Sequence, residues 1–198
     1  MFRTNELIYL GLIGAITIAL GVVLGTALNA TGIPMLGGLA NAVVTAAVLT
    51  IGVKGVQKFG SGTILWVVVS TLAIPTLSMG PPGAHKLLVG VVAGLLWDVC
   101  LVVTRRTKWG YLVSGAVMML AVMLGVFGVA LYFDFPAAET LKSAIAYVLP
   151  INFVLGMLGT WLGLTVYEKR ISRVRFVQSL QRSSRGVACN DEHTDDSA

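Results

Sequence analysis

Hydrophobic residues fill six long stretches of this chain, and polar residues gather mainly in the short segments between them. The stretches cover residues 7–30, 33–53, 62–79, 87–104, 111–133 and 141–167. Each is about 18–27 residues long, enough for a helix to cross a hydrocarbon core about 30 Å thick. Because a bilayer core offers no water to backbone amides, such segments are expected to be helices. The pattern predicts an all-α integral membrane protein, a bundle of six transmembrane helices.

Positive charges divide unequally between the two sets of connecting segments. Of the 14 Lys and Arg residues, 12 lie on the side of the N-terminus, and the other two are Lys86 and Lys142. The positive-inside rule therefore predicts cytoplasmic N- and C-termini and a multi-pass protein of the plasma membrane. This topology explains the net charge of +5, so nucleic acid is not an expected partner.

The membrane part leaves little room for a soluble domain. Residues 1–167 form the predicted six-helix domain, and residues 168–198 form a tail that is basic and then acidic. The basic part is expected to follow the anionic inner leaflet, and the acidic end is expected to be disordered.

Motifs for catalysis are missing from the sequence. It contains no G-x-x-x-x-G-K-[ST] and no H-E-x-x-H, and its two histidines are His85 and His193. Gly60-Ser61-Gly62 resembles an intramembrane protease motif, but no span supplies a histidine as base. We expect no enzyme activity, no cofactor and no metal site.

Small residues recur along the first stretch. Gly11, Ala15 and Ala19 are spaced every fourth residue, which leaves a flat surface for close approach of another helix. The stripe serves either internal packing or docking of a partner. The same alternatives apply to Gly90 with Gly94, and to the glycines at positions 156, 159 and 163.

Asp98 is the acidic residue inside a predicted span. A carboxylate costs about 2.5–3.5 kcal/mol at the bilayer centre, and less near an interface with a cationic partner. Arg105 follows seven residues later, on roughly the same helix face. We predict a structural ion pair between Asp98 and Arg105, with a proton or cation site as the alternative.

Other polar residues mark the outer halves of the spans. Asn41 and Asn152 are amides within spans, and Pro150 breaks the hydrogen-bond ladder beside Asn152. Gly80-Pro-Pro-Gly83 precedes His85 and Lys86, and we interpret this loop as a lid over an outward-facing pocket. The amides bind either a ligand or a neighbouring helix.

These features together resemble the substrate-binding (S) components of energy-coupling factor (ECF) transporters, which import vitamins and trace nutrients. The resemblance covers about residues 7–170 and rests on the size and on six spans with both ends inside. It rests also on four segments of the sequence: Ala15-Ile-Thr-Ile-Ala19, Phe59-Gly-Ser-Gly-Thr63, Gly80-Pro-Pro-Gly83 and Ala93-Gly-Leu-Leu-Trp-Asp98.

The resemblance implies a mechanism and partners. An S component binds a small-molecule nutrient from outside and docks, here through Gly11, Ala15 and Ala19, on a transmembrane T component. Two separate cytoplasmic ATPases drive the cycle, which accounts for the missing phosphate loop. The substrate-binding candidates are Asn41, Trp66, His85, Lys86, Tyr147 and Asn152.

The candidates suggest the class of substrate. Nickel and cobalt members of the wider group to which the resemblance points begin with a metal-binding histidine. This sequence has no histidine before His85, so the resemblance argues against a transition metal. Amides, aromatic rings and a cation suit a planar heteroaromatic vitamin or its precursor. Two other classes stay open: a self-sufficient secondary transporter, and a structural membrane subunit that binds no small molecule.

Overall fold

A computed structural model describes residues 2–30, 36–76, 83–133, 137–174 and 177–178. Within these residues the chain forms six α-helices and one short 3-10 helix, so the all-helical prediction is confirmed. The helices are α1 (Thr4–Asn29), α2 (Leu36–Val56), α3 (Ser61–Ala73), α4 (His85–Val103), α5 (Lys108–Tyr132), α6 (Ala137–Lys169) and η1 (Ile171–Arg173).

Five of the helices are long and apolar enough to cross a membrane, namely α1, α2, α4, α5 and α6. The prediction of a third span over residues 62–79 is wrong in length, because α3 ends at Ala73. Pro75 follows closely and has no backbone N–H to continue the helix. With 13 residues, α3 is about 20 Å long and falls short of a 30 Å core.

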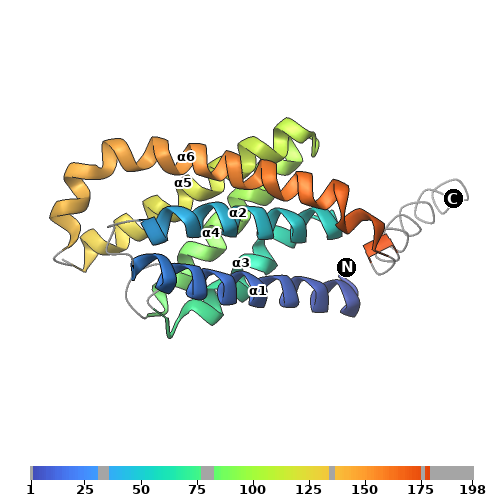
Figure 1. Cartoon of the computed structure of the whole chain (residues 1–198), viewed down its shortest axis with the longest axis horizontal. Helices are drawn as coiled ribbons and strands as arrows, with labels where there is room; N and C mark the ends of the chain where they lie inside the picture. The colour runs from blue at the N-terminus through green and yellow to red at the C-terminus, as the bar shows by residue number, and fades with distance from the viewer. Residues whose placement is uncertain (1, 31–35, 77–82, 134–136, 175–176, 179–198) are drawn as a thin grey trace, which may run out of the picture.

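The helices form a closed ring in which each contacts the next. Its order is α1, α2, α6, α5, α4 and α3, which returns to α1, and α2 also contacts α3 and α5 across the centre. Figure 1 shows α1, α2 and α6 running along the long axis of the molecule. The start of α1 and the end of α6 lie at the same end of the bundle.

Glycines allow α6 to approach its two neighbours closely. A Cβ added to Gly159 or Gly163 would collide with backbone carbonyls of α2, and one added to Gly156 would lie 2.9 Å from the carbonyl oxygen of Gly115 on α5. For these three positions, the reading as internal packing is confirmed.

A stripe of four residues joins α4 to α3. Lys86, Gly90, Gly94 and Asp98 are spaced every fourth residue and so share one face of α4. The two glycines bring the backbones together, since a Cβ on Gly94 would lie 2.6 Å from the Cα of Thr63. The charged residues stand at the two ends of this close contact.

Asp98 binds the first turn of α3. Its carboxylate is 2% exposed and accepts hydrogen bonds from the backbone N–H of Gly62 at 3.0 Å and of Thr63 at 2.8 Å. The Thr63 hydroxyl donates a third bond at 2.7 Å. These N–H groups have no partner within the helix, and the negative charge suits the positive end of its dipole.

The predicted ion pair between Asp98 and Arg105 is therefore wrong. The two ion pairs found among the described residues join Lys58 to Glu6 at 2.8 Å and Lys108 to Glu168 at 3.0 Å. Arg105 is exposed in the turn after α4, where its φ is 49°. Helical spacing suggested the pair, but the carboxylate of Asp98 accepts its hydrogen bonds from the backbone of α3 instead.

Lys86 binds the other end of α3. Its side chain is 1% exposed, and the ammonium donates hydrogen bonds to the carbonyls of Ala73 at 2.9 Å and Thr76 at 2.6 Å. Carbonyls at a helix C-terminus lack partners within the helix, and a cation suits the negative end of the dipole. Helix α4 therefore supplies a charge of the complementary sign to each end of α3.

We predict that each charge stabilises the fold. Asp98→Asn and Lys86→Met should each lower the free energy of unfolding by about 1–3 kcal/mol, because each leaves buried backbone groups without a charged partner. The measurement is the thermal unfolding midpoint of the purified protein in one detergent.

Lys108→Met is the matched control, because its exposed ion pair with Glu168 should contribute about 0–1 kcal/mol. Equal shifts in Lys86→Met and Lys108→Met would contradict the role of Lys86 at the end of α3.

Candidate functional site

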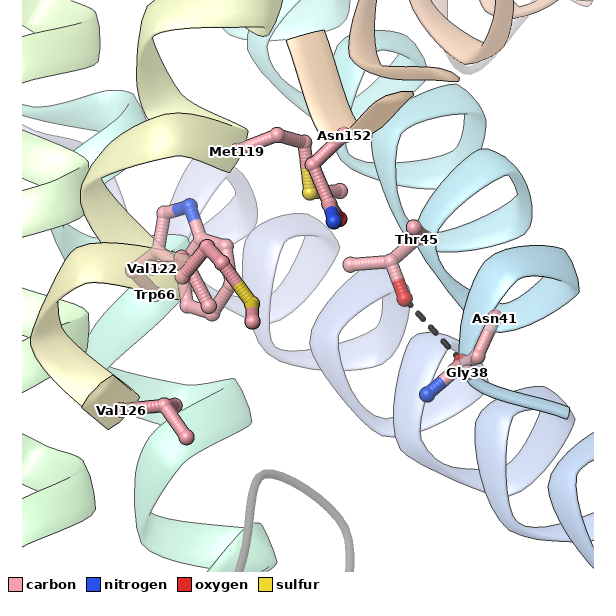
Figure 2. A pocket seen from close by; sticks show the side chains of 10 residues that line it. Gly38, Asn41, Thr45, Trp66, Met119, Val122, Val126 and Asn152 are labelled. Carbon is pink, nitrogen blue, oxygen red and sulfur yellow. Dashed lines mark hydrogen bonds between the residues drawn. The ribbon is translucent and has the colours of Figure 1, made fainter. Parts of the chain in front are cut away.

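A cavity of about 210 Å³ lies inside the ring of helices, between α2, α3, α5 and α6 (Figure 2). Its walls are mainly apolar, with a few polar side chains, which is the usual composition of small-molecule sites. The lining residues are Gly38, Asn41, Ala42, Thr45, Trp66, Met119, Val122, Met123, Val126 and Asn152.

Three of the six predicted substrate-binding residues line this cavity together. Asn41 comes from α2, Trp66 from α3 and Asn152 from α6. They are far apart in the sequence, and the ring order of the helices brings them around one space. In Figure 2, Trp66 stands across the space from Thr45 and Asn41.

Asn41 is held by contacts on two sides. The Thr45 hydroxyl, one turn later on α2, donates a hydrogen bond to its Oδ1 at 3.2 Å. On the other side, a Cβ added to Gly21 of α1 would lie 2.7 Å from that same oxygen. Glycine at position 21 therefore leaves the room that Asn41 needs. The amide nitrogen of Asn41 makes no hydrogen bond within the described residues.

Asn152 lies two residues after Pro150, in the interior of α6. Its Nδ2 donates a hydrogen bond to the carbonyl of Val148 at 2.9 Å. Because a carbonyl can only accept, this bond fixes which way the amide is turned. Its Oδ1 accepts no bond from the described part of the chain. Figure 2 shows the amide between Met119 and Thr45.

Trp66 carries a buried donor without an acceptor. The side chain is 0% exposed, and its Nε1 has no hydrogen-bond partner among the described residues. An unsatisfied buried donor costs about 1–3 kcal/mol, so each example requires an explanation. Ser70, Trp97 and Thr160 also hold such atoms, but none of them lines the cavity.

The other three candidates lie elsewhere. Lys86 binds the carbonyl end of α3, and its ammonium is therefore committed to the fold. Tyr147 is 74% exposed on the outside of α6, where a tyrosine can lie at the membrane interface. His85 lines a different hollow. Sequence position placed all three near the outer ends of helices, but their directions around the helices separate them from the cavity.

The hollow at His85 is a groove of about 480 Å³ between α4 and α5. The His85 ring lies 6.5 Å from the ring of Phe133, and Leu88 and Tyr132 are among the exposed lining residues. Because its walls are apolar and open outward from the bundle, lipid chains can fill it. The predicted lid, Gly80–Gly83, lies largely outside the described residues.

Sequence reasoning missed several lining residues. Thr45 follows Asn41 by one helical turn, so the spacing of polar residues in the span was a signal for it. Met119, Val122 and Met123 gave no such signal, because apolar residues of a transmembrane helix look alike whether they face lipid, a neighbour or a cavity. Only the packing of α5 distinguishes them.

Comparisons with known proteins give no further guide. No family model, no curated protein and no solved structure matches this chain. Within the described residues, no group of three His, Cys, Asp or Glu side chains could hold a metal ion. The groups present are amides, a hydroxyl and an indole, which can bind a small molecule by hydrogen bonds and ring contacts.

We predict that Asn152→Ala weakens binding of the small molecule in this cavity by about 1–3 kcal/mol, because a buried polar contact is lost. The measurement is a titration of the purified protein with the bound species once native mass spectrometry has identified it.

Tyr147→Phe, on the same helix but pointing outward, is the control and should leave affinity unchanged. If Asn152→Ala binds as tightly as the unchanged protein, the amide is not part of the site.

Proposed function

We propose that this chain is the membrane-embedded substrate-capture subunit of an ECF-type importer. The observation that carries the proposal is the cavity itself. Asn41, Trp66 and Asn152, which the sequence singled out as ligand contacts, line one space inside the bundle. A subunit with a purely structural role has no need of a cavity lined by two amides that keep an unpaired donor and an unpaired acceptor.

The distribution of charge supports an outward-facing site. Described cations gather at the end of the bundle where α1 begins and α6 ends; they include Lys54, Lys58, Arg105, Arg106, Lys108, Lys169, Arg170 and Arg173. At the opposite end Lys86 is buried. By the positive-inside rule, the charged end faces the cytoplasm of a cell whose plasma membrane holds the protein. Asn41, in the second turn of α2, then lies in the outer half.

The surface of α1 supports docking on a partner. Ala15 and Ala19 are exposed, and a Cβ added to Gly11 would meet no atom within 4 Å. By contrast, Gly14 faces Val68 and Gly21 faces Asn41 inside the bundle. Helix α1 therefore has one small-residue face that is used internally and another that is open. The open face suits close contact with a helix of a T component.

The proposed cycle uses these two surfaces in turn. The cavity takes up a nutrient from outside, and the open face of α1 docks the loaded subunit on the transmembrane T component. Two cytoplasmic ATPases, which are separate chains, then drive the movement that opens the cavity inward. This division of labour fits a sequence that contains no phosphate-binding loop of its own.

Native mass spectrometry of the purified chain, taken from cells grown in rich medium, tests the capture role. We expect one bound small molecule per chain and a lower occupancy in Asn152→Ala. A chain that stays empty after incubation with a panel of vitamins would contradict the proposal. It would favour a structural subunit or a weakly binding secondary transporter.

A separate prediction concerns docking. Ala15→Leu and Ala19→Leu should abolish co-purification with the T component and ATPases, together with uptake, because a bulky side chain keeps the helices apart. Ligand affinity should stay within about twofold.

Ala146→Leu is the matched control, since Ala146 is an exposed alanine on α6. Parallel loss of ligand binding and docking in Ala15→Leu would contradict a dedicated docking face, as would equal loss of docking in Ala146→Leu.

A further inference from the structure

The cavity has a distinctive electrostatic character. No charged side chain is found among its described lining residues. The two buried charges of α4 are already used, since Asp98 binds the first turn of α3 and Lys86 binds the carbonyl of its last residue, Ala73, and that of Thr76 just beyond it. An ionised ligand would give up part of its water shell here without gaining an opposite charge, which is unfavourable.

Its polar atoms form a mixed set of donors and acceptors. Asn152 offers Oδ1 as an acceptor, because its nitrogen is bound to the Val148 carbonyl. Asn41 offers its Nδ2 as a donor, because its oxygen accepts from Thr45. The Nε1–H of Trp66 is fully buried and out of reach of a ligand, so it does not belong to this set, although the residue lines the cavity. A ligand that satisfies this set needs at least one donor and one acceptor of its own.

The size and the apolar walls limit the rest of the ligand. The volume of about 210 Å³ is larger than a cavity of about 150 Å³ that holds benzene, and smaller than the roughly 300–1,000 Å³ of drug-sized pockets. Met119 and Met123 add polarizable sulfur atoms to the lining, which favour contact with a flat aromatic surface. One ring with small substituents fits this space.

We propose that the ligand is an uncharged, single-ring heterocycle with a hydrogen-bond donor and an acceptor on its edge. This inference rests on the proposed capture role and narrows its substrate class. It excludes carboxylate and cationic vitamins as the molecules that the cavity selects. The recognising atoms are Asn152 Oδ1 and Asn41 Nδ2.

Two pairs of small molecules test the prediction that the cavity selects an uncharged ligand, which we call the charge rule. The members of each pair share a ring and differ in charge. The pairs are nicotinamide with nicotinate and uracil with orotate. The full-length chain in lipid nanodiscs is titrated with each, and binding is followed by calorimetry and by tryptophan fluorescence. We expect the neutral member of at least one pair to bind at least tenfold more tightly than its carboxylate. Asn152→Ala should weaken binding of the neutral member at least fivefold.

The outcomes separate the two proposals. Equal or tighter binding of the carboxylates, with the same dependence on Asn152, would overturn the charge rule and leave the capture role intact. If no probe binds, the species found by native mass spectrometry decides. A neutral single-ring molecule supports the inference, and an ion or a multi-ring molecule refutes it. A chain that carries and binds nothing refutes both proposals.

Asn41→Ala is a second variant, which removes the Nδ2 donor from the cavity. We expect it to weaken the neutral probe at least threefold, because the hydrogen bond to the ligand is lost. Unchanged affinity would remove Asn41 from the recognising set. The matched control is Tyr147→Phe, at an exposed position on α6.

Discussion

The short helix α3 imposes the constraint on which the rest of the bundle depends. It is about 20 Å long, and the two charged residues that bind its ends, Asp98 and Lys86, are both buried. Backbone groups at such ends must find partners within the protein. Helix α4 supplies them with Asp98 at one end and Lys86 at the other. The glycines at positions 90 and 94 allow the close approach that makes both contacts possible.

This arrangement determines the character of the cavity. Helix α3 carries Trp66, so the charges that hold α3 also hold one wall of the site. The polar groups of the described lining come from α2, α3 and α6 and are amides, a hydroxyl and an indole. The energetics of the fold and the selectivity of the site are therefore linked. A membrane protein can keep a lysine and an aspartate buried at low cost when each has several hydrogen-bonding partners.

The small residues of α1 and α6 divide between two roles that sequence spacing alone leaves open. Neighbouring helices occupy the space beside Gly14, Gly21 and the α6 glycines. An open surface of α1 instead carries Gly11, Ala15 and Ala19. One motif thus serves the interior in some places and the exterior in others. The difference follows from the angle at which each residue leaves its helix, and that angle has meaning only once the neighbours are in place.

The sequence by itself determined the helical class, the approximate limits of five long helices, and two amides and an indole as candidates for one site. It could do so because length, hydropathy and isolated polar residues in apolar segments are local properties. Only the tertiary structure decided that α3 is short, that Asp98 and Lys86 bind its ends, and that Met119 joins Asn41 at one cavity. These outcomes depend on which helices are neighbours and how they are rotated. No single segment contains that information.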